Sequence, residues 1–91
     1  MFPKSTNTKQ SIALGKVIKH LRITHNFKPE YIAHQIGLSV SSLHKVEKGL
    51  TCVRFSDIHK ISRGLKITLD EIGLLYEKEL EKLPPPAENE G

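Results

Sequence analysis

The stretch from residue 29 to residue 47, PEYIAHQIGLSVSSLHKVE, constrains the fold of this chain more than any other. Pro29 suits the first position of a helix, because its ring already holds a helical φ and its missing N–H would have no partner there. Ile32 and Ile36 follow on one helical face. Gly37 then interrupts the pattern, as expected where the chain turns with a positive φ. The stretch therefore predicts two short helices that meet at a tight corner.

The second of these helices follows Ser39, whose hydroxyl can cap it by accepting from free backbone N–H groups. Leu43 and Val46 lie three residues apart and are expected to face the core. The opposite face carries small, polar and basic side chains, namely Val40, Ser41, His44, Lys45 and Lys48. A short helix with such a face fits the major groove of DNA, which is about 12 Å wide.

A wider set of residues recurs at ordered spacings around these helices: Leu14-Gly15, Leu21-Arg22, Ile32-Ala33, Gly37, Leu43, Glu47-x-Gly49, Ile58, Ile61, Leu65 and Ile67-x-Leu69. With this set, residues 14–72 resemble the lambda-repressor/Cro-type (XRE-family) helix-turn-helix DNA-binding domain. The resemblance covers about two-thirds of the chain. It implies an all-α, five-helix fold, here with an extended C-terminal helix, and a regulator that binds double-stranded DNA.

The resemblance places the helix around residues 40–47 in the major groove, with its early residues at base edges. Carried over position by position, it implies that the bases are read by Val40, Ser41, His44 and Lys45. Val40 would press on a thymine methyl group, and Lys45 would donate to guanine O6 and N7. Phosphate contacts position the protein without reading sequence, and they are assigned to Lys28, Ser39, Ser42, Lys48, Thr51 and Arg54.

The resemblance also pairs Arg22 in the first helix with Glu47 at the end of the third. A planar guanidinium can hold a carboxylate through two parallel hydrogen bonds, so we expect this ion pair to be structural. Two positions depart from the family. Lys28 stands where a Ser or Thr usually caps the second helix, and Pro29 stands where a Gln commonly anchors a phosphate. Pro29 offers no donor for that anchor, and Lys28 offers charge there instead.

Two flanking helices are expected to complete the core. The first runs from Ser11 to about His25 and places on one face Leu14, Ile18, Leu21 and His25. The other runs from about Phe55 to Arg63, and its core positions are Phe55, Ile58, either Ile61 or Ser62, and Leu65.

The last helix is predicted over residues 69–83, with Thr68 and Glu71 as a capping box at its start. Its apolar stripe consists of Leu69, Ile72, Leu75, Tyr76, Leu80 and Leu83. This helix is longer than the family's minimal domain needs, so its surplus apolar surface must be buried elsewhere. We expect it to form the interface of a homodimer. The alternative is that it packs back onto its own first helix.

Charge divides the chain into two parts. The formal net charge is +4, but residues 1–76 hold 12 Lys and Arg against 5 Asp and Glu, whereas residues 77–91 hold 2 against 5. A basic domain attracts a polyanion such as DNA. We therefore expect a flexible N-terminal arm over residues 1–10, the DNA-binding domain over residues 11–83, and a disordered acidic tail over residues 84–91, after three prolines stop the helix.

Several classes of function are not expected. The chain lacks a run of about 18 apolar residues for a membrane span, and its first residues lack the apolar core of a signal peptide, which favours a cytoplasmic location. A single cysteine, Cys52, excludes an internal disulfide and a cysteine-rich zinc site. The five histidines are scattered, and His44 shares a face only with Glu47, which the ion pair occupies. We expect no metal, no cofactor and no enzymatic activity.

The chain is thus predicted to be a sequence-specific transcriptional regulator, by default a repressor that binds operator DNA as a homodimer. The alternative is an antitoxin or another protein-interaction module that uses the same fold to bind a protein partner, such as a toxin or another regulator. Convergence of Lys28, Lys45, Lys48 and Arg54 on one face would favour DNA. Acidic or apolar groups covering that face would favour the protein partner.

Overall fold

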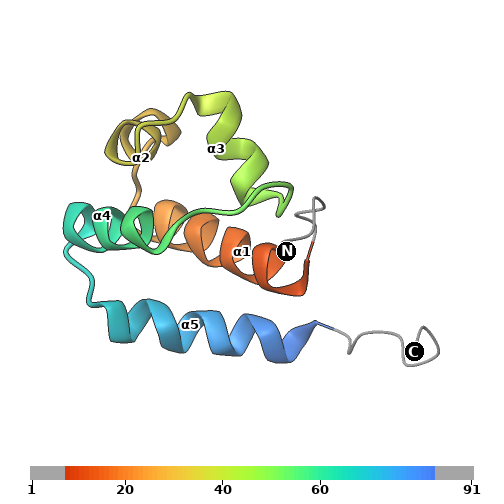
Figure 1. The fold of residues 1–91 in the computed structure, drawn as a ribbon. Coiled ribbons are helices and arrows are strands. Elements are labelled where there is room, and N and C mark those ends of the chain that lie inside the picture. Colours follow the sequence, from red (N-terminus) through yellow and green to blue (C-terminus); the bar gives the residue numbers. More distant parts are fainter. Residues whose placement is uncertain (1–7, 84–91) are drawn as a thin grey trace.

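Five helices make up residues 8–83, the part of the chain that the computed structural model describes. They are α1 (Lys9–Thr24), α2 (Pro29–Gln35), α3 (Val40–Glu47), α4 (Phe55–Leu65) and α5 (Leu69–Lys82). Helices α2 and α3 lie on one side of α1 and α4, and α5 runs along the other side (Figure 1). Both α3 and α5 pack against α1. The predicted all-α fold is confirmed, with α1 as the element that joins its two sides.

Helix α1 begins earlier than the apolar spacing predicts. Thr8 caps it: the Thr8 hydroxyl accepts from the Ser11 N–H at 3.1 Å, and the Ser11 hydroxyl accepts from the Thr8 N–H at 3.0 Å. Residues 8–10 of the predicted arm therefore belong to this helix and its cap. The rest of the arm and the acidic tail lie outside the described residues.

The end of α1 corrects one expectation about the core. Thr24 is the last helical residue, and His25 follows as an exposed C-cap rather than as a core residue. The chain turns at Asn26, whose φ of 62° is left-handed. The helix therefore ends before another turn could carry the His25 side chain over the core.

The apolar faces of all five helices meet in one core. Its buried members are Val17, Ile18, Leu21, Ile32, Ala33, Ile36, Leu43, Val46, Ile58, Ile61, Leu65, Ile67 and Ile72. Phe55 was predicted to join them, but its side chain is 71% exposed. Phe55 is the first residue of α4, so it lies on the correct stripe but one turn beyond the edge of the core.

Helix α5 packs partly on its own domain. The Thr68 hydroxyl accepts from the Glu71 N–H at 3.1 Å, which is one half of the predicted capping box. Ile72 is buried, while Leu69, Leu75 and Tyr76 pack half-buried against the core. Part of the apolar stripe is therefore used within the domain. Among residues 8–83, no helix is long and apolar enough to cross a membrane.

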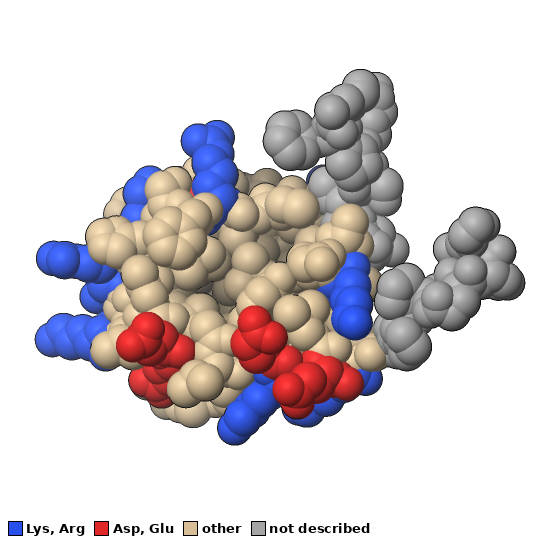
Figure 2. Space-filling model, turned by 60° about the horizontal axis from the view of Figure 1, so that its bottom comes forward, with Lys and Arg blue, Asp and Glu red and all other residues tan. Residues whose placement is uncertain are grey.

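The outer side of α5 is acidic. The helix carries Asp70, Glu71, Glu77, Glu79 and Glu81 against two lysines. Figure 2 shows Asp and Glu side chains gathered on the face that α5 forms. This face lies across the domain from α3 (Figure 1), so the charge asymmetry seen in the sequence becomes a difference between two sides of the fold.

Candidate nucleic-acid interface

The corner between α2 and α3 is held by backbone geometry. Gly37 has a φ of 71°, the left-handed conformation that glycine adopts without strain. Beyond it, the Leu38 N–H donates to the Ala33 carbonyl at 2.8 Å. The Ser39 hydroxyl then caps α3 by accepting from the Ser42 N–H at 3.1 Å. These contacts set the direction of α3 relative to α2.

At the start of α2, a lysine stands where the family usually has a capping Ser or Thr, and the side-chain cap is missing as expected. Lys28 is the N-cap residue, and its side chain makes no capping hydrogen bond. Phe27 and Tyr31 stack there with their ring centroids 4.6 Å apart, and the Tyr31 hydroxyl donates to the Gly64 carbonyl at 3.2 Å. The Tyr31 hydroxyl therefore ties the start of α2 to the end of α4, although α2 has no side-chain cap.

Helix α3 separates a buried face from an exposed one. Leu43, Val46 and Glu47 are buried. The exposed face forms a surface hollow lined by Val40, Ser41, His44, Lys45, Lys48 and Leu50. All four residues predicted to read bases thus lie together on one surface, and Lys48 adjoins them.

The loop after α3 extends this surface. Gly49 ends the helix with a φ of 81°. A second hollow is lined by residues of α3, the loop and the start of α4, including Ser42, Lys45, Thr51 and Arg54. Lys45 borders both hollows, which therefore form one continuous surface. Of the four basic residues whose convergence would favour DNA, three border this surface, namely Lys45, Lys48 and Arg54.

Two members of the predicted phosphate-binding set line neither hollow. Lys28 lies at the N-cap of α2. Ser39 is engaged in its cap, and its hydroxyl also donates to the Ser42 hydroxyl oxygen at 3.1 Å. One carboxylate, Asp57, lines the second hollow and accepts from the Arg54 N–H at 3.3 Å. The surface is therefore mainly basic, with its single acid beside Arg54.

An ion pair joins α3 to α1. The Arg22 Nε donates to Glu47 Oε2 at 2.7 Å, and Arg22 Nη2 donates to Glu47 Oε1 at 3.2 Å. The side chains are 13% and 4% exposed, respectively. The structure thus contains the two-bond geometry that the resemblance implied, and the pair fixes the C-terminal end of α3 on the domain.

Gly15 allows α1 to pack closely against the end of α3, a role that the sequence alone did not reveal. A Cβ at this position would lie 2.2 Å from the Val46 carbonyl oxygen and 2.9 Å from that of Glu47. Only glycine lets the backbone of α1 approach the end of α3 so closely. The signal in the sequence is a glycine inside a helix, but the partner that explains it lies about thirty residues away.

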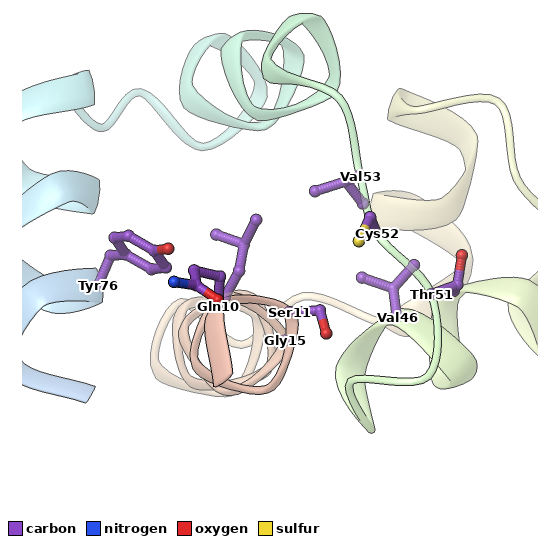
Figure 3. Close-up of a pocket in the computed structure, with 9 residues that line it drawn as sticks. Gln10, Ser11, Gly15, Val46, Thr51, Cys52, Val53 and Tyr76 are labelled. Atoms are coloured by element: carbon purple, nitrogen blue, oxygen red, sulfur yellow. The ribbon is translucent and has the colours of Figure 1, made fainter. Parts of the chain in front are cut away.

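A small cavity lies beside this approach, between α1 and the loop after α3. Figure 3 shows Gly15 and Ser11 on α1 facing Val46 and Cys52. The Ser11 hydroxyl donates to the Gly49 carbonyl at 3.2 Å, which ties the loop to α1. The cavity measures about 150 Å³, below the ~300 Å³ at which small-molecule sites usually begin. It is better explained as a packing gap than as a ligand site.

Among residues 8–83, no group of three or more His, Cys, Asp or Glu side chains is placed to hold a metal ion. The cysteine thiol of Cys52 is exposed on the loop. Burial, and then the nearby Glu77 carboxylate, raise the pKa of Tyr76.

Comparison with known proteins decides the family. A family model described as Helix-turn-helix (HTH_3) matches residues 18–72, which is more than half of the chain. The chain belongs to this helix-turn-helix family. The match spans α2, the corner, α3 and α4, and so includes every residue that lines the two hollows. Helix-turn-helix proteins of this XRE type are DNA-binding regulators and not enzymes. The family therefore confirms the predicted DNA-binding regulator and the prediction that the protein is not an enzyme.

Solved structures agree on the fold of this helix-turn-helix protein. Two similar ones are variants of the restriction-modification controller protein C.Esp1396I. One is an arginine-to-alanine variant in a trigonal crystal form, with a TM-score of 0.71, and the other is a tyrosine-to-phenylalanine variant with a TM-score of 0.72. Each is 19% identical to this chain, and each match covers 82% of this chain and 100% of the controller protein. No curated protein matches the sequence.

Proposed function

We propose that this protein is a transcriptional regulator that reads operator DNA with α3. One observation carries the proposal: the four predicted base-reading side chains share one exposed surface on α3, and Lys48 and Arg54 border it. The opposite face of α3 is buried and held by the Arg22–Glu47 pair. A helix fixed on one side and exposed on the other can enter a groove without losing its own packing.

The two sets of residues have different roles on DNA. Lys45 donates to guanine O6 and N7, and Val40 contacts a thymine methyl group, while Ser41 and His44 reach a base edge or a phosphate. Lys48, Arg54 and Thr51 hold phosphates and fix the register. Because α3 has few side chains that bind a base through two hydrogen bonds, we expect part of the specificity to come from DNA shape. We also propose a cytoplasmic location, where a regulator of this kind would reach the DNA that it binds.

Sequence specificity is tested by selecting duplexes from a random library and measuring their affinity by fluorescence anisotropy at about 150 mM salt. A regulator should bind the selected duplex at least ~10³-fold more tightly than a scrambled duplex of the same length. Equal affinity for the two duplexes would contradict sequence reading. The sign of regulation is tested separately by placing the selected duplex across a reporter promoter, where we expect repression because a bound protein occludes the polymerase.

We also propose that the protein acts as a homodimer. A single helix-turn-helix unit contacts only a few base pairs, and a twofold pair reads two half-sites. An apolar groove of about 270 Å³ lies between α1, α4 and α5, and it is lined by Leu14, Phe55, Ile58, Leu69, Ile72, Gly73 and Tyr76. The exposed Phe55 ring stands at its rim. Because ring and groove share one face, two copies related by a twofold axis can each place Phe55 in the other's groove.

This groove shifts the centre of the predicted interface. Leu69 and Tyr76 line it, while Ile72 forms part of its floor and is only 5% exposed. Leu75 and Leu80 on α5 and its C-cap residue Leu83 are half-buried and do not line the groove. We therefore assign the interface to the start of α4 and the first turns of α5, with the rest of the apolar stripe at its edge.

Analytical ultracentrifugation tests the dimer, with Phe55→Ser against Leu74→Ser. Leu74 is a fair control because it is 65% exposed on α5 and does not line the groove. We expect Phe55→Ser to raise the dimer dissociation constant by at least tenfold and Leu74→Ser to leave it unchanged. A monomeric wild type at high micromolar concentration, or dimers unaffected by Phe55→Ser, would contradict this interface.

A protein partner, such as a toxin or another regulator, is a second candidate. It is favoured by the acidic outer face of α5 (Figure 2). The exposed Leu74 lies on this helix, within one turn of Asp70, Glu71 and Glu77 in the sequence. Such a face fits a basic partner surface with an apolar centre. Purification of tagged wild type and Leu74→Asp from the native cells tests this proposal. A basic protein retained only by the wild type would support it, and identical co-purifying proteins would contradict it.

A further inference from the structure

A third hollow, also basic, lies between α1 and α3, next to the proposed reading surface. It measures about 260 Å³ and is lined by Lys19, Arg22, His44, Glu47 and Lys48. His44 and Lys48 line both this hollow and the exposed face of α3. The basic surface is therefore continuous from α3 onto α1, where Lys19 extends it.

Lys19 is brought there by the close packing of the two helices. It follows Gly15 by one helical turn and precedes Arg22 by three residues, so all three share the side of α1 that meets α3. Gly15 contacts the backbone of Val46 and Glu47, and Arg22 holds the Glu47 carboxylate. From its spacing within α1, Lys19 could be read only as a solvent-facing residue.

The charges in this hollow are not balanced internally. Within residues 8–83, the ion pairs are Arg22–Glu47 and Lys82–Glu79. Arg22 and Glu47 therefore neutralise each other, and the ammonium groups of Lys19 and Lys48 remain as positive charge facing solvent. A concave surface with two such ammonium groups beside a groove-reading helix attracts an anion.

We propose that this hollow binds a phosphate of the DNA backbone and that Lys19 is a DNA contact. The inference rests on the proposed entry of α3 into the major groove, because the strand at the C-terminal end of α3 then passes over Lys48 and onto α1. Lys19 adds affinity and salt dependence without reading bases, since a phosphate contact releases condensed counterions but carries no sequence information.

The test is a salt series of anisotropy titrations on the selected duplex and on its scrambled counterpart. It compares wild type, Lys19→Ala, Lys19→Arg and the matched control Lys16→Ala. Lys16 is exposed on the same helix but does not line the hollow. The slope of log K against log salt is negative, and we expect Lys19→Ala to make it shallower by about 0.9 on both duplexes. It should weaken binding by the same factor on each, whereas Lys19→Arg and Lys16→Ala keep the wild-type slope.

The remaining outcomes separate this inference from the proposed function. A Lys19→Ala slope equal to that of the wild type would overturn the contact while leaving DNA binding intact. If Lys16→Ala and Lys19→Ala changed the salt slope equally, the effect would come from the overall positive charge of α1. That result would also overturn the proposed Lys19 contact. A Lys19→Ala loss confined to the selected duplex would make Lys19 a base reader, contrary to the proposal. A wild type that binds neither duplex would overturn the proposed function and this inference together.

Discussion

Replacing Gly15 by alanine tests how α1 holds α3 in place. The new Cβ would lie 2.2 Å from the Val46 carbonyl oxygen, roughly 1.3 Å closer than an ordinary contact of about 3.5 Å. The obstacle is backbone, which cannot rotate away, so the two helices must separate. Overpacking of this kind costs about 3 kcal/mol at the upper end of its usual range. Alanine recovers about 1 kcal/mol through its higher helix propensity. The net loss of unfolding free energy is therefore about 2 kcal/mol.

Gly73 provides a matched control for this experiment. It also lies inside a helix, but no atom lies within 4 Å of where its Cβ would stand. Gly73→Ala should therefore stabilise the fold by up to about 1 kcal/mol. Thermal unfolding followed by circular dichroism should show Gly15→Ala melting roughly 8–16 °C below the wild type, and Gly73→Ala melting above it. One low protein concentration must be used throughout, because dimerisation would make the midpoint depend on concentration. A Gly15→Ala protein as stable as the wild type would refute the close approach of α1 and α3.

Three further predictions concern the contacts around α1 and α5. Arg22→Ala leaves the buried Glu47 carboxylate without its partner, so urea unfolding should show a loss of about 3 kcal/mol, and the double variant Arg22→Met with Glu47→Leu should recover most of it. Thr8→Ala removes the cap of α1 and should cost about 1 kcal/mol in the same assay; an unchanged midpoint would mean that α1 starts elsewhere. Because the pKa of Tyr76 is raised in the fold, the unfolded chain loses this proton first. The unfolding free energy should therefore fall as pH rises above about 10, and Tyr76→Phe should reduce that fall measurably between pH 9 and 11.

The elements whose signals are local could be predicted from the sequence. The α2–corner–α3 unit depends on Pro29, Gly37 and Ser39, which act on their own backbone within a few residues, and the structure places all three as expected. The base-reading candidates were found together on one surface because helical spacing determines which residues share a face. The Arg22–Glu47 pair came from the family resemblance and not from spacing, since 25 residues separate its members.

Other features depend on where helices meet, which spacing within one helix cannot show. Phe55 lies on the correct stripe of α4, but its exposure is decided by where that helix begins relative to α1 and α5. The role of Gly15 and the position of Lys19 both follow from the crossing of α1 and α3. The start of α1 was missed because Ser11 completes the capping box in place of the usual Glu or Gln.

The most direct test of α3 as a sequence-reading helix is a comparison of Lys45→Ala with Lys48→Ala on duplexes that each carry one base-pair change from the selected site. Both lysines are exposed on the same surface, so both substitutions remove the same charge. If α3 reads DNA as proposed, Lys45→Ala should abolish discrimination of about 1–3 kcal/mol at one or two base pairs, whereas Lys48→Ala should weaken binding to every duplex equally. Uniform weakening by Lys45→Ala, with every base preference retained, would contradict the account.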